Sequence, residues 1–274
     1  MKVIFLGTSS GAGKTTVTAM YCRYLKRKGV NVAPFKALNL SLRSSVTKDG
    51  LEIGTGQALQ AIMSEIEPNI DMNPILLKPS GNGKIRTIVN GEEWDTSIKT
   101  NGAEASLKKA CAAFDRLSAG YEAVVCEGSG SPVELNMMDR DIANIGIMRE
   151  RKIPAVLVGD IERGGVFAAL YGTWLLMPED VRPLLKGFII NRFRGDPSIL
   201  AGAIDRIEKL TGMRFIGTIP YADVKFPEED SLSENGDGSY DNTAEALIKR
   251  MDSLLSETEK YGFDMGKIKD ISSP

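Results

Sequence analysis

The 274-residue sequence contains no histidine. This absence excludes Ser-His-Asp and Cys-His catalytic arrangements, and histidine-ligated metal sites, within these residues. The chemistry must therefore use carboxylates, lysine, backbone amides or bound ions. The sequence has only three cysteines, Cys22, Cys111 and Cys126, and their uneven spacing does not fit a disulfide framework or a zinc site. We expect reduced thiols, with two of the three in apolar periodic segments.

Long apolar runs and an excess of positive charge are also missing. Stretches such as PAVLVG at 154–159 fall far short of the about 20 residues that cross a bilayer, and residues 1–7 lack the cleavage region of a signal peptide. The 34 basic residues are balanced by 36 acidic ones and are spread along the chain, so no basic footprint for nucleic acid exists. The sequence predicts a cytoplasmic globular protein with no nucleic-acid or membrane partner.

Short β-like runs alternate with segments of helical periodicity along most of the chain. The strand candidates are 3–7, 31–36, 122–128, 154–160, 186–192 and 214–220. The helix candidates are 13–28, 54–66, 102–118, 139–151, 165–176 and 198–210. Near-continuous apolar strands separated by helices predict an α/β fold with a mostly parallel sheet and helices on both of its faces.

Two segments fall outside this alternation. Residues 85–94, IRTIVNGEEW, predict a small hairpin insertion around Asn90-Gly91. Residues 233–242 have turn composition and precede a helix near 242–260 and a polar end. We therefore expect one domain over 1–232, followed over 233–274 by a flexible linker and a C-terminal helix that packs on or beside it.

The first predicted strand leads directly into GTSSGAGKTT at 7–16. A glycine-rich turn between a buried strand and a helix points backbone N–H groups at a phosphate, and the helix N-terminus adds partial positive charge. Lys14 would reach the β- and γ-phosphates of a nucleotide, and Thr15 would offer its hydroxyl to Mg²⁺. A glycine turn that binds nothing is the alternative. The predicted phosphate cradle of this P-loop NTPase-type fold is Gly11, Ala12, Gly13, Lys14, Thr15 and Thr16.

Charged side chains stand at the ends of three further predicted strands. Glu127 and Asp160 each follow an apolar strand, where ligands of open α/β sheets bind, so either carboxylate could hold Mg²⁺. We favour Glu127, because Asp160 leads toward a helix and is about equally suited to capping it. Lys36 ends the second strand and could neutralise charge during phosphoryl transfer. Taken alone, Lys36 fits a solvated surface lysine better.

Several segments in residues 1–232 resemble, in the same order, the amino-terminal synthetase domain of the cobyric acid synthase family. They include GTSSGAGKTT, VAPFKALNLSL, DMNPILLKPSGNG, CEGSGSPVELNMMDRDIAN, PAVLVGDIERGGVFAAL, KGFIINRFRGDPSIL and FPEEDSL. The wider group includes dethiobiotin synthetase. Five residues, not the usual four, separate Gly7 from Gly13, and this spacing is similar to that of dethiobiotin synthetase.

The resemblance implies an ATP- and Mg²⁺-dependent amide ligase. In this reaction ATP phosphorylates a side-chain carboxylate of a corrinoid, adenosylcobyrinic acid a,c-diamide, or of a similar carboxylic acid, and ammonia then displaces the phosphate. A carboxylate is a poor electrophile, and phosphorylation supplies its leaving group. The implied catalytic residues are Lys14, Lys36 and Glu127.

The resemblance also implies where the ligands lie. It assigns the metal to Thr15, Glu52 and Glu127 and the adenine contact to Asn191. Gln57 falls where the family places a further polar group near the metal. The residues implied on the substrate side are Gln57, Asp139, Arg140, Asp141, Asn144, Asp160 and Arg163.

The sequence departs from the family at its end. The family continues into a glutamine amidotransferase domain with a histidine-activated cysteine, and this sequence has no histidine. We expect ammonia from a separate glutaminase subunit or from solution, and the polar end favours a natural terminus over a truncation. A homodimer is a candidate state, because many relatives are dimers.

Two alternatives remain. A dethiobiotin synthetase-like enzyme would share the loop and the acid but would lack segments such as DMNPILLKP and RDIAN. A regulatory ATPase related to the partitioning and septum-site proteins would carry a second P-loop lysine at positions 8–10, which here hold threonine and serine.

Overall fold

The computed structural model describes residues 1–41, 43–80, 85–94, 102–223, 226 and 241–272. Within these residues a six-stranded sheet has the order β12-β11-β10-β1-β9-β2, and every neighbouring pair runs parallel. This confirms the predicted parallel sheet. Its strands are β1 (Lys2–Gly7), β2 (Val32–Phe35), β9 (Ala123–Glu127), β10 (Ala155–Asp160), β11 (Leu185–Phe193) and β12 (Arg214–Pro220).

The central strand β1 shows why the sheet forms. It reads KVIFLG, pairs with β10 on one side and β9 on the other, and buries the side chains of residues 3–6 completely. Apolar strands without alternation are typical of parallel sheets that are covered on both faces. Because the strands run parallel, the residues that follow β1, β2, β9, β10 and β11 meet at one edge of the sheet.

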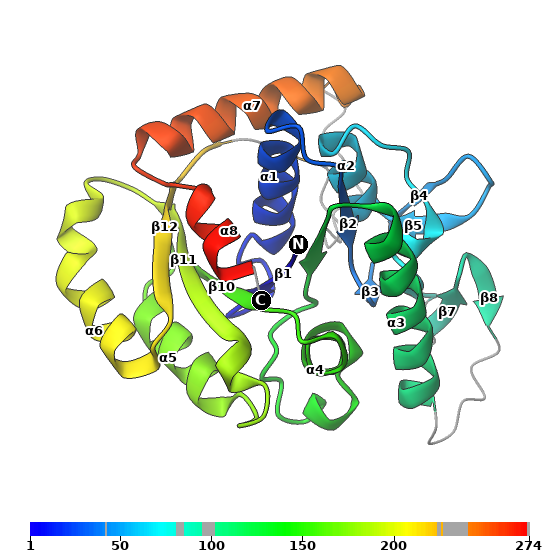
Figure 1. Ribbon diagram of the computed structural model, residues 1–274, viewed down its shortest axis with the longest axis horizontal. Coiled ribbons are helices and arrows are strands. Elements are labelled where there is room, and N and C mark those ends of the chain that lie inside the picture. The colour runs from blue at the N-terminus through cyan, green and yellow to red at the C-terminus, as the bar shows by residue number, and fades with distance from the viewer. Residues whose placement is uncertain (42, 81–84, 95–101, 224–225, 227–240, 273–274) are drawn as a thin grey trace.

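Helices cover both faces of this sheet, which completes the predicted α/β fold. Figure 1 shows α1 and α7 above the strands and α4 and α5 below them. One core cluster contains apolar residues of α1 (Lys14–Arg27), α2 (Thr55–Met63), α7 (Ala244–Lys260) and α8 (Gly266–Ser272). The other contains residues of α3 (Gly102–Gly120), α4 (Ile147–Arg151), α5 (Val166–Leu176) and α6 (Ala201–Thr211).

The predicted hairpin at 85–94 is present but belongs to a larger unit. Asn90 and Gly91, both with positive φ (52° and 84°), connect β7 to β8, and β7 also pairs antiparallel with β6. This second sheet has the order β3-β6-β7-β8, and β4 and β5 form a separate antiparallel pair. The strands are β3 (Asn39–Leu40), β4 (Ser44–Val46), β5 (Glu52–Gly54), β6 (Ile75–Pro79), β7 (Ile85–Val89) and β8 (Glu92–Trp94).

Residues 139–151 differ from the single helix that their periodicity predicts. Two short helical turns, η2 (Met138–Arg140) and the π-helical η3 (Ile142–Gly146), precede α4. Asp141 between them is extended, and its side chain accepts hydrogen bonds from the backbone N–H groups of Asn144 and Ile145. This cap starts a new helix and so interrupts the old one. The remaining short turns are η1 (Ile70–Met72), η4 (Arg182–Leu184) and η5 (Pro197–Leu200).

The C-terminal segment contains a helix that the sequence did not predict. α8 buries Ile268 and Ile271 in the same cluster as Phe263 and the apolar face of α7. Charged residues surround these two isoleucines in the sequence and hide the periodicity. The predicted boundary at 232/233, and the predicted linker up to residue 240, lie outside the described residues.

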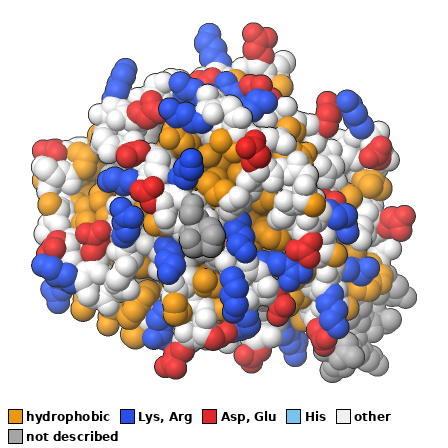
Figure 2. Space-filling view, in the orientation of Figure 1, with side chains coloured by type: hydrophobic (Ala, Val, Ile, Leu, Met, Phe, Trp, Pro, Cys, Tyr) orange, Lys and Arg blue, Asp and Glu red, His pale blue; other side chains and the backbone are white. Residues whose placement is uncertain are grey.

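The surface carries mixed charge. Figure 2 shows lysine and arginine interspersed with aspartate and glutamate over the face in view. Across the part of the chain that the structure describes, no helix combines the length and the apolar character needed to span a membrane.

Candidate nucleotide and metal site

The glycine-rich loop between β1 and α1 has the backbone shape of a phosphate cradle. Gly11 and Gly13 have φ of 71° and 97°, in the left-handed region that favours glycine. A Cβ at Gly13 would lie 2.1 Å from Nδ2 of Asn191, which donates a 2.9 Å hydrogen bond to the carbonyl of Ala12. Asn191, near the end of β11, therefore braces the loop from a strand that lies two positions from β1 in the sheet.

Lys14, the first residue of α1, lies folded over this loop. Its side chain is buried, and its Nζ donates to the carbonyls of Ser9 (3.3 Å) and Gly130 (2.9 Å). A Cβ on Gly7 would lie 2.8 Å from the same Nζ, so glycine at that position makes room for the lysine. The ammonium thus links the P-loop to the loop that follows β9.

Glu127, at the end of β9, is the centre of a buried polar cluster. It is 1% exposed. Its Oε1 accepts hydrogen bonds from Thr15 Oγ1 (2.8 Å) and Lys36 Nζ (2.9 Å). Its Oε2 accepts from Gln60 Nε2 (2.5 Å) and Gln57 Nε2 (3.4 Å). The two oxygens therefore face different partners: Oε1 faces the P-loop helix α1 and the residue directly after β2, and Oε2 faces α2.

The charges in this cluster favour an ionised carboxylate. Burial by itself raises the pKa of Glu127, but the positive charges of Lys36 and Lys14 and the hydrogen bond from Thr15 outweigh it and lower the pKa below its usual value. Lys36 is 4% exposed, so the alternative of a solvated surface lysine is wrong. Two buried opposite charges that lie within hydrogen-bonding distance offset much of their desolvation cost.

Thr15 and Glu127 fit a hard divalent cation. Mg²⁺ prefers oxygen ligands, keeps several waters, and is commonly held by one or two protein groups together with substrate phosphates. Among the described residues, no three histidine, cysteine, aspartate or glutamate side chains gather into a metal cluster. A hydroxyl and a carboxylate beside a phosphate loop therefore suit a cation that arrives with a nucleotide.

Glu52, predicted as a third metal ligand, makes its described contacts elsewhere. Its Oε2 pairs with Lys78 Nζ at 2.5 Å and accepts from Ser44 Oγ at 2.7 Å. The hydrogen bonds from Lys78 and Ser44 lower the pKa of Glu52. Its role toward a metal stays a prediction.

Asp141 and Asn144, predicted on the substrate side, form a hydrogen-bonded unit. Asn144 is buried, and its side chain both accepts from the backbone N–H of Ser129 (3.1 Å) and donates to the Ser129 carbonyl (2.8 Å). It also donates to Asp141 Oδ2 (2.7 Å). Burial raises the pKa of Asp141. The pair thus holds the backbone directly after Glu127.

Asp160 pairs with an arginine and does not cap the following helix. Its Oδ2 lies 2.7 Å from an Nη of Arg192, and its Oδ1 accepts from the backbone N–H of Glu162 at 2.9 Å. The N-cap of α5 is Gly165, so the capping alternative for Asp160 is wrong.

The other residues predicted on the substrate side divide into two kinds. Asp139, Arg140 and Arg163 are exposed, the first two in η2 and the third before α5. Gln57, in contrast, is fully buried between Glu127 and Asn39, whose Nδ2 donates to Gln57 Oε1 at 3.3 Å. Its described contacts are therefore inside the buried cluster, with Oε2 of Glu127 and with Asn39.

Comparison with known families agrees with this geometry. The family described as CobQ/CobB/MinD/ParA nucleotide binding domain matches residues 3–233, which include every residue of the P-loop and of the Glu127 cluster. The chain belongs to this family.

Within this nucleotide-binding family, the similar proteins include probable cobyric acid synthases. The chain is 50% identical over 236 residues to a probable cobyric acid synthase of Methanoculleus marisnigri, covering 85% of this chain and 48% of that protein. A probable cobyric acid synthase of Archaeoglobus fulgidus is 48% identical over 231 residues, with 83% and 50% covered. The chain thus spans about half the length of these relatives.

A solved structure shares the fold of this domain. The MinC:MinD cell division protein complex of Aquifex aeolicus matches with a TM-score of 0.52 and 13% identity, over 99% of this chain and 97% of that one. At this identity the likeness is one of fold.

Gln60 and Asn73 belong to the site of this domain although the sequence analysis did not identify them. Gln60 is fully buried and lies three residues after Gln57, so a helical wheel of 54–66 places both amides on one face. Asn73 accepts from the backbone N–H of Gly54 (2.9 Å) and donates to the carbonyl of Lys36 (3.1 Å). The sequence carries no local signal for these contacts of Asn73, so only the three-dimensional structure could reveal them.

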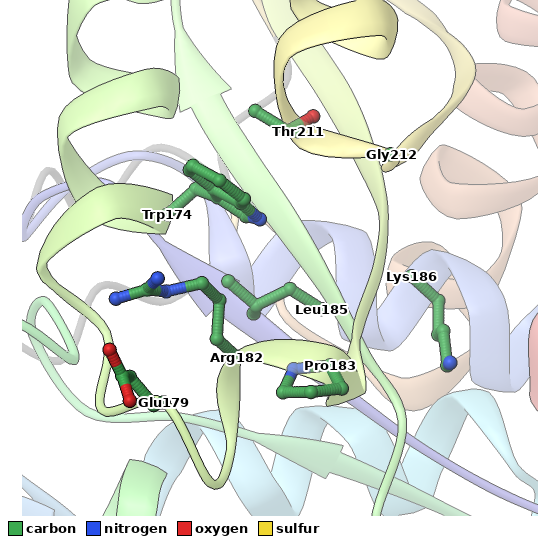
Figure 3. Close-up of a pocket in the computed structure, with 8 residues that line it drawn as sticks. All are labelled: Trp174, Glu179, Arg182, Pro183, Leu185, Lys186, Thr211 and Gly212. Atoms are coloured by element: carbon green, nitrogen blue, oxygen red, sulfur yellow. The ribbon is translucent and has the colours of Figure 1, made fainter.

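A cavity of about 430 Å³ is lined by none of the residues of this site. Figure 3 shows the residues that line it. Trp174 and Arg182 line it beside Leu185, at the amino-terminal end of β11, whereas the P-loop follows the carboxyl end of β1. Arg182 stacks on Trp174 and donates hydrogen bonds to the carbonyls of Leu175 and Met177. Its guanidinium therefore stabilises the local fold. This cavity supplies no group to the nucleotide site.

Proposed function

We propose that this chain acts as the ATP-dependent synthetase part of a carboxylate-amine ligase of the cobyric acid synthase type. The Thr15–Glu127–Lys36 cluster beside the P-loop, in which Glu127 and Lys36 are buried, is the observation that carries the proposal. It combines an ionised carboxylate and a hydroxyl for a cation with two ammonium groups for phosphate charge. The 50% identity to a probable cobyric acid synthase supports the choice of reaction.

The chain's own residues would first bind and orient the nucleotide. Backbone N–H groups of residues 11–16 and the start of α1 attract the phosphates. Lys14 would leave the carbonyls of Ser9 and Gly130 for the terminal phosphates, a short movement for a flexible side chain. We assign the contact with the adenine ring to Asn191, which already lies against the loop.

Thr15 and Glu127 would hold Mg²⁺, which supplies positive charge to the phosphoryl group that is transferred. The oxygen of a substrate carboxylate attacks the γ-phosphorus, the bond to the bridging oxygen breaks, and ADP leaves. Lys36 would stabilise negative charge on the reacting groups. Ammonia then attacks the acyl carbon, inorganic phosphate leaves, and the released proton passes to solvent.

The substrate in this proposal is a corrinoid carboxylate, adenosylcobyrinic acid a,c-diamide, or a related carboxylic acid. Exposed Asp139, Arg140 and Arg163 stand in two loops after strands β9 and β10, where a large ligand can reach them. We include Asp160 with this group, because it fixes the start of the loop that carries Arg163.

The ammonia source lies outside these 274 residues, since a histidine-activated glutaminase cysteine requires a histidine that the sequence lacks. We propose a glutaminase outside these residues, or free ammonia, as the source, action in the cytoplasm, and a homodimer as the assembly to test first.

The proposal is tested by trapping the activated acid. The protein is incubated with Mg-ATP, hydroxylamine and candidate acids, and ADP and hydroxamate are measured together. A ligase of this type yields both products only with its own acid, and the identity of that acid separates a corrinoid ligase from a dethiobiotin synthetase-like enzyme. Slow ADP formation without hydroxamate for any acid would instead identify a regulatory ATPase and refute the proposal.

A further inference from the structure

We propose that Gln60 is a positioning residue that fixes which oxygen of Glu127 meets the cation and so makes the site select Mg²⁺ over Ca²⁺. This inference rests on the proposed role of Glu127 as a metal ligand and extends it to a residue without an assigned function. It concerns the choice of cation, and it does not depend on which acid the enzyme activates.

The hydrogen bonds divide the Glu127 carboxylate into two unlike oxygens. Oε1 faces Thr15, the second residue of α1, and Lys36, and therefore lies toward the phosphate loop. Oε2 faces the amide nitrogens of Gln60 and Gln57 on α2. A second cation ligand through Oε2 would require the cation to displace these buried amides.

The direction of the Gln60 amide supports this role. Its Nε2 points at Glu127 Oε2, with a longer contact of 3.5 Å to the carbonyl of Thr15. Its Oε1 is buried and has no hydrogen-bond partner among the described residues. Rotating the amide would place that oxygen against the carboxylate, acceptor against acceptor. The protein thus leaves one buried carbonyl unpaired and keeps the donor on Glu127, which is unfavourable unless the donor serves a purpose.

The consequence is a carboxylate that offers one oxygen. Mg²⁺ is small and prefers octahedral geometry with single oxygens and waters, whereas Ca²⁺ takes six to eight oxygens and often binds carboxylates through both. When the amides hold Oε2, Glu127 offers a cation only Oε1. This suits Mg²⁺ and weakens the binding of Ca²⁺. Residues that orient a ligand in this way commonly change metal affinity by about 10- to 100-fold when they are replaced.

The test measures binding of a fluorescent ATP analogue as a function of Mg²⁺ or of Ca²⁺ concentration. The wild-type protein should be half-saturated at a lower concentration of Mg²⁺ than of Ca²⁺. Gln60→Met keeps the length of the side chain but loses the donor, so Oε2 keeps only the longer 3.4 Å hydrogen bond from Gln57. We expect the half-saturation concentration for Ca²⁺, divided by that for Mg²⁺, to fall by about tenfold in this variant.

Two further variants keep the test sharp. Gln60→Asn retains an amide that is one methylene too short to reach Oε2, so it should move the ratio in the same direction even where Gln60→Met folds poorly. Thr18→Val is the matched control, because Thr18 is buried on the adjoining helix α1 and its hydroxyl has no hydrogen-bond partner among the described residues. Its cation ratio should equal that of the wild type.

The outcomes separate this inference from the proposed function. An unchanged ratio in both Gln60 variants, or equal losses for Mg²⁺ and Ca²⁺, would overturn the inference, because general damage to the site weakens both cations alike. A wild-type protein that binds the nucleotide without any divalent cation would overturn the proposed metal site itself. A failed hydroxamate assay with the cation ratios as expected would refute the ligase and leave the role of Gln60 supported.

Discussion

The phosphate side and the substrate side of the site are built differently. On the phosphate side, Lys14, Lys36 and Glu127 are buried and hydrogen-bonded, and each stands at the start of a helix or the end of a strand. On the substrate side, Arg140 and Arg163 are exposed in short turns. The difference teaches that the fold already holds Lys14, Lys36 and Glu127 in place, whereas these two arginines, proposed for the acid, are exposed to solvent.

Replacing Lys14 should break the phosphate side most severely. Lys14→Ala removes an ammonium next to the transferred group, and we expect ATP turnover to fall by about 10²- to 10³-fold or more. The variant also loses the hydrogen bonds to the carbonyls of Ser9 and Gly130, so thermal unfolding is measured alongside to show that the fold persists. Lys48→Ala serves as the control, since that lysine is exposed and pairs, among the described residues, with exposed Glu67. Normal turnover in Lys14→Ala would show that the P-loop is not the reacting site.

Breaking the buried ion pair should have the largest effect on stability. Glu127→Ala leaves the buried ammonium of Lys36 without its carboxylate, and the free energy of unfolding should fall by about 3–5 kcal/mol. The double variant Glu127→Ala/Lys36→Met removes both charges and should recover much of this loss. Urea denaturation measures both. Equal losses in the single and the double variant would contradict a strong pairing of the two charges.

The lowered pKa of Glu127 predicts how the stability of the phosphate side depends on pH. Because this pKa is lowered in the folded protein, ionised Glu127 stabilises the fold fully above the unfolded value of about 4.3, and this contribution is lost as the pH falls through the folded value. The difference in free energy of unfolding between wild type and Glu127→Gln should therefore be constant from pH 8 to about pH 5 and shrink below about pH 4. A difference that grows on acidification would reverse the sign and refute the lowered pKa.

The substrate side should show the smallest effect on stability. Arg163→Ala replaces an exposed side chain, so the free energy of unfolding should stay within about 0.5 kcal/mol of wild type. The expected change is a higher KM for the acid substrate with an unchanged KM for ATP, measured by steady-state kinetics. An unchanged KM for every acid that yields hydroxamate would remove Arg163 from the substrate side.

The sequence predicted the central sheet and the P-loop because local patterns determine them. A few neighbouring residues are enough to predict the structure of the run VIFLG, of the loop with glycines at 11 and 13, and of the apolar strand before Glu127. The short strands β3 to β6 and helix α8 were not predicted, because strands of two to five residues and a helix rich in lysine carry too little periodicity.

The partners of Glu127 show the same limit within the site. The sequence predicted that Glu127 and Lys36 each lie at the end of a strand. The contact with Gln60 joins residues 67 positions apart, and the contact of Asn73 with Lys36 joins two loops, so both depend on the assembled fold.

The most direct measurement follows the carboxylate oxygen of the acid substrate. The acid is labelled with ¹⁸O in its carboxyl group, the reaction is run with Mg-ATP and ammonia, and the inorganic phosphate is examined by ³¹P NMR. Activation by phosphoryl transfer to the carboxylate predicts one labelled oxygen in each phosphate released with the amide. Phosphate without the label would mean that ATP is hydrolysed by water at this site, and the proposed ligase chemistry would be wrong.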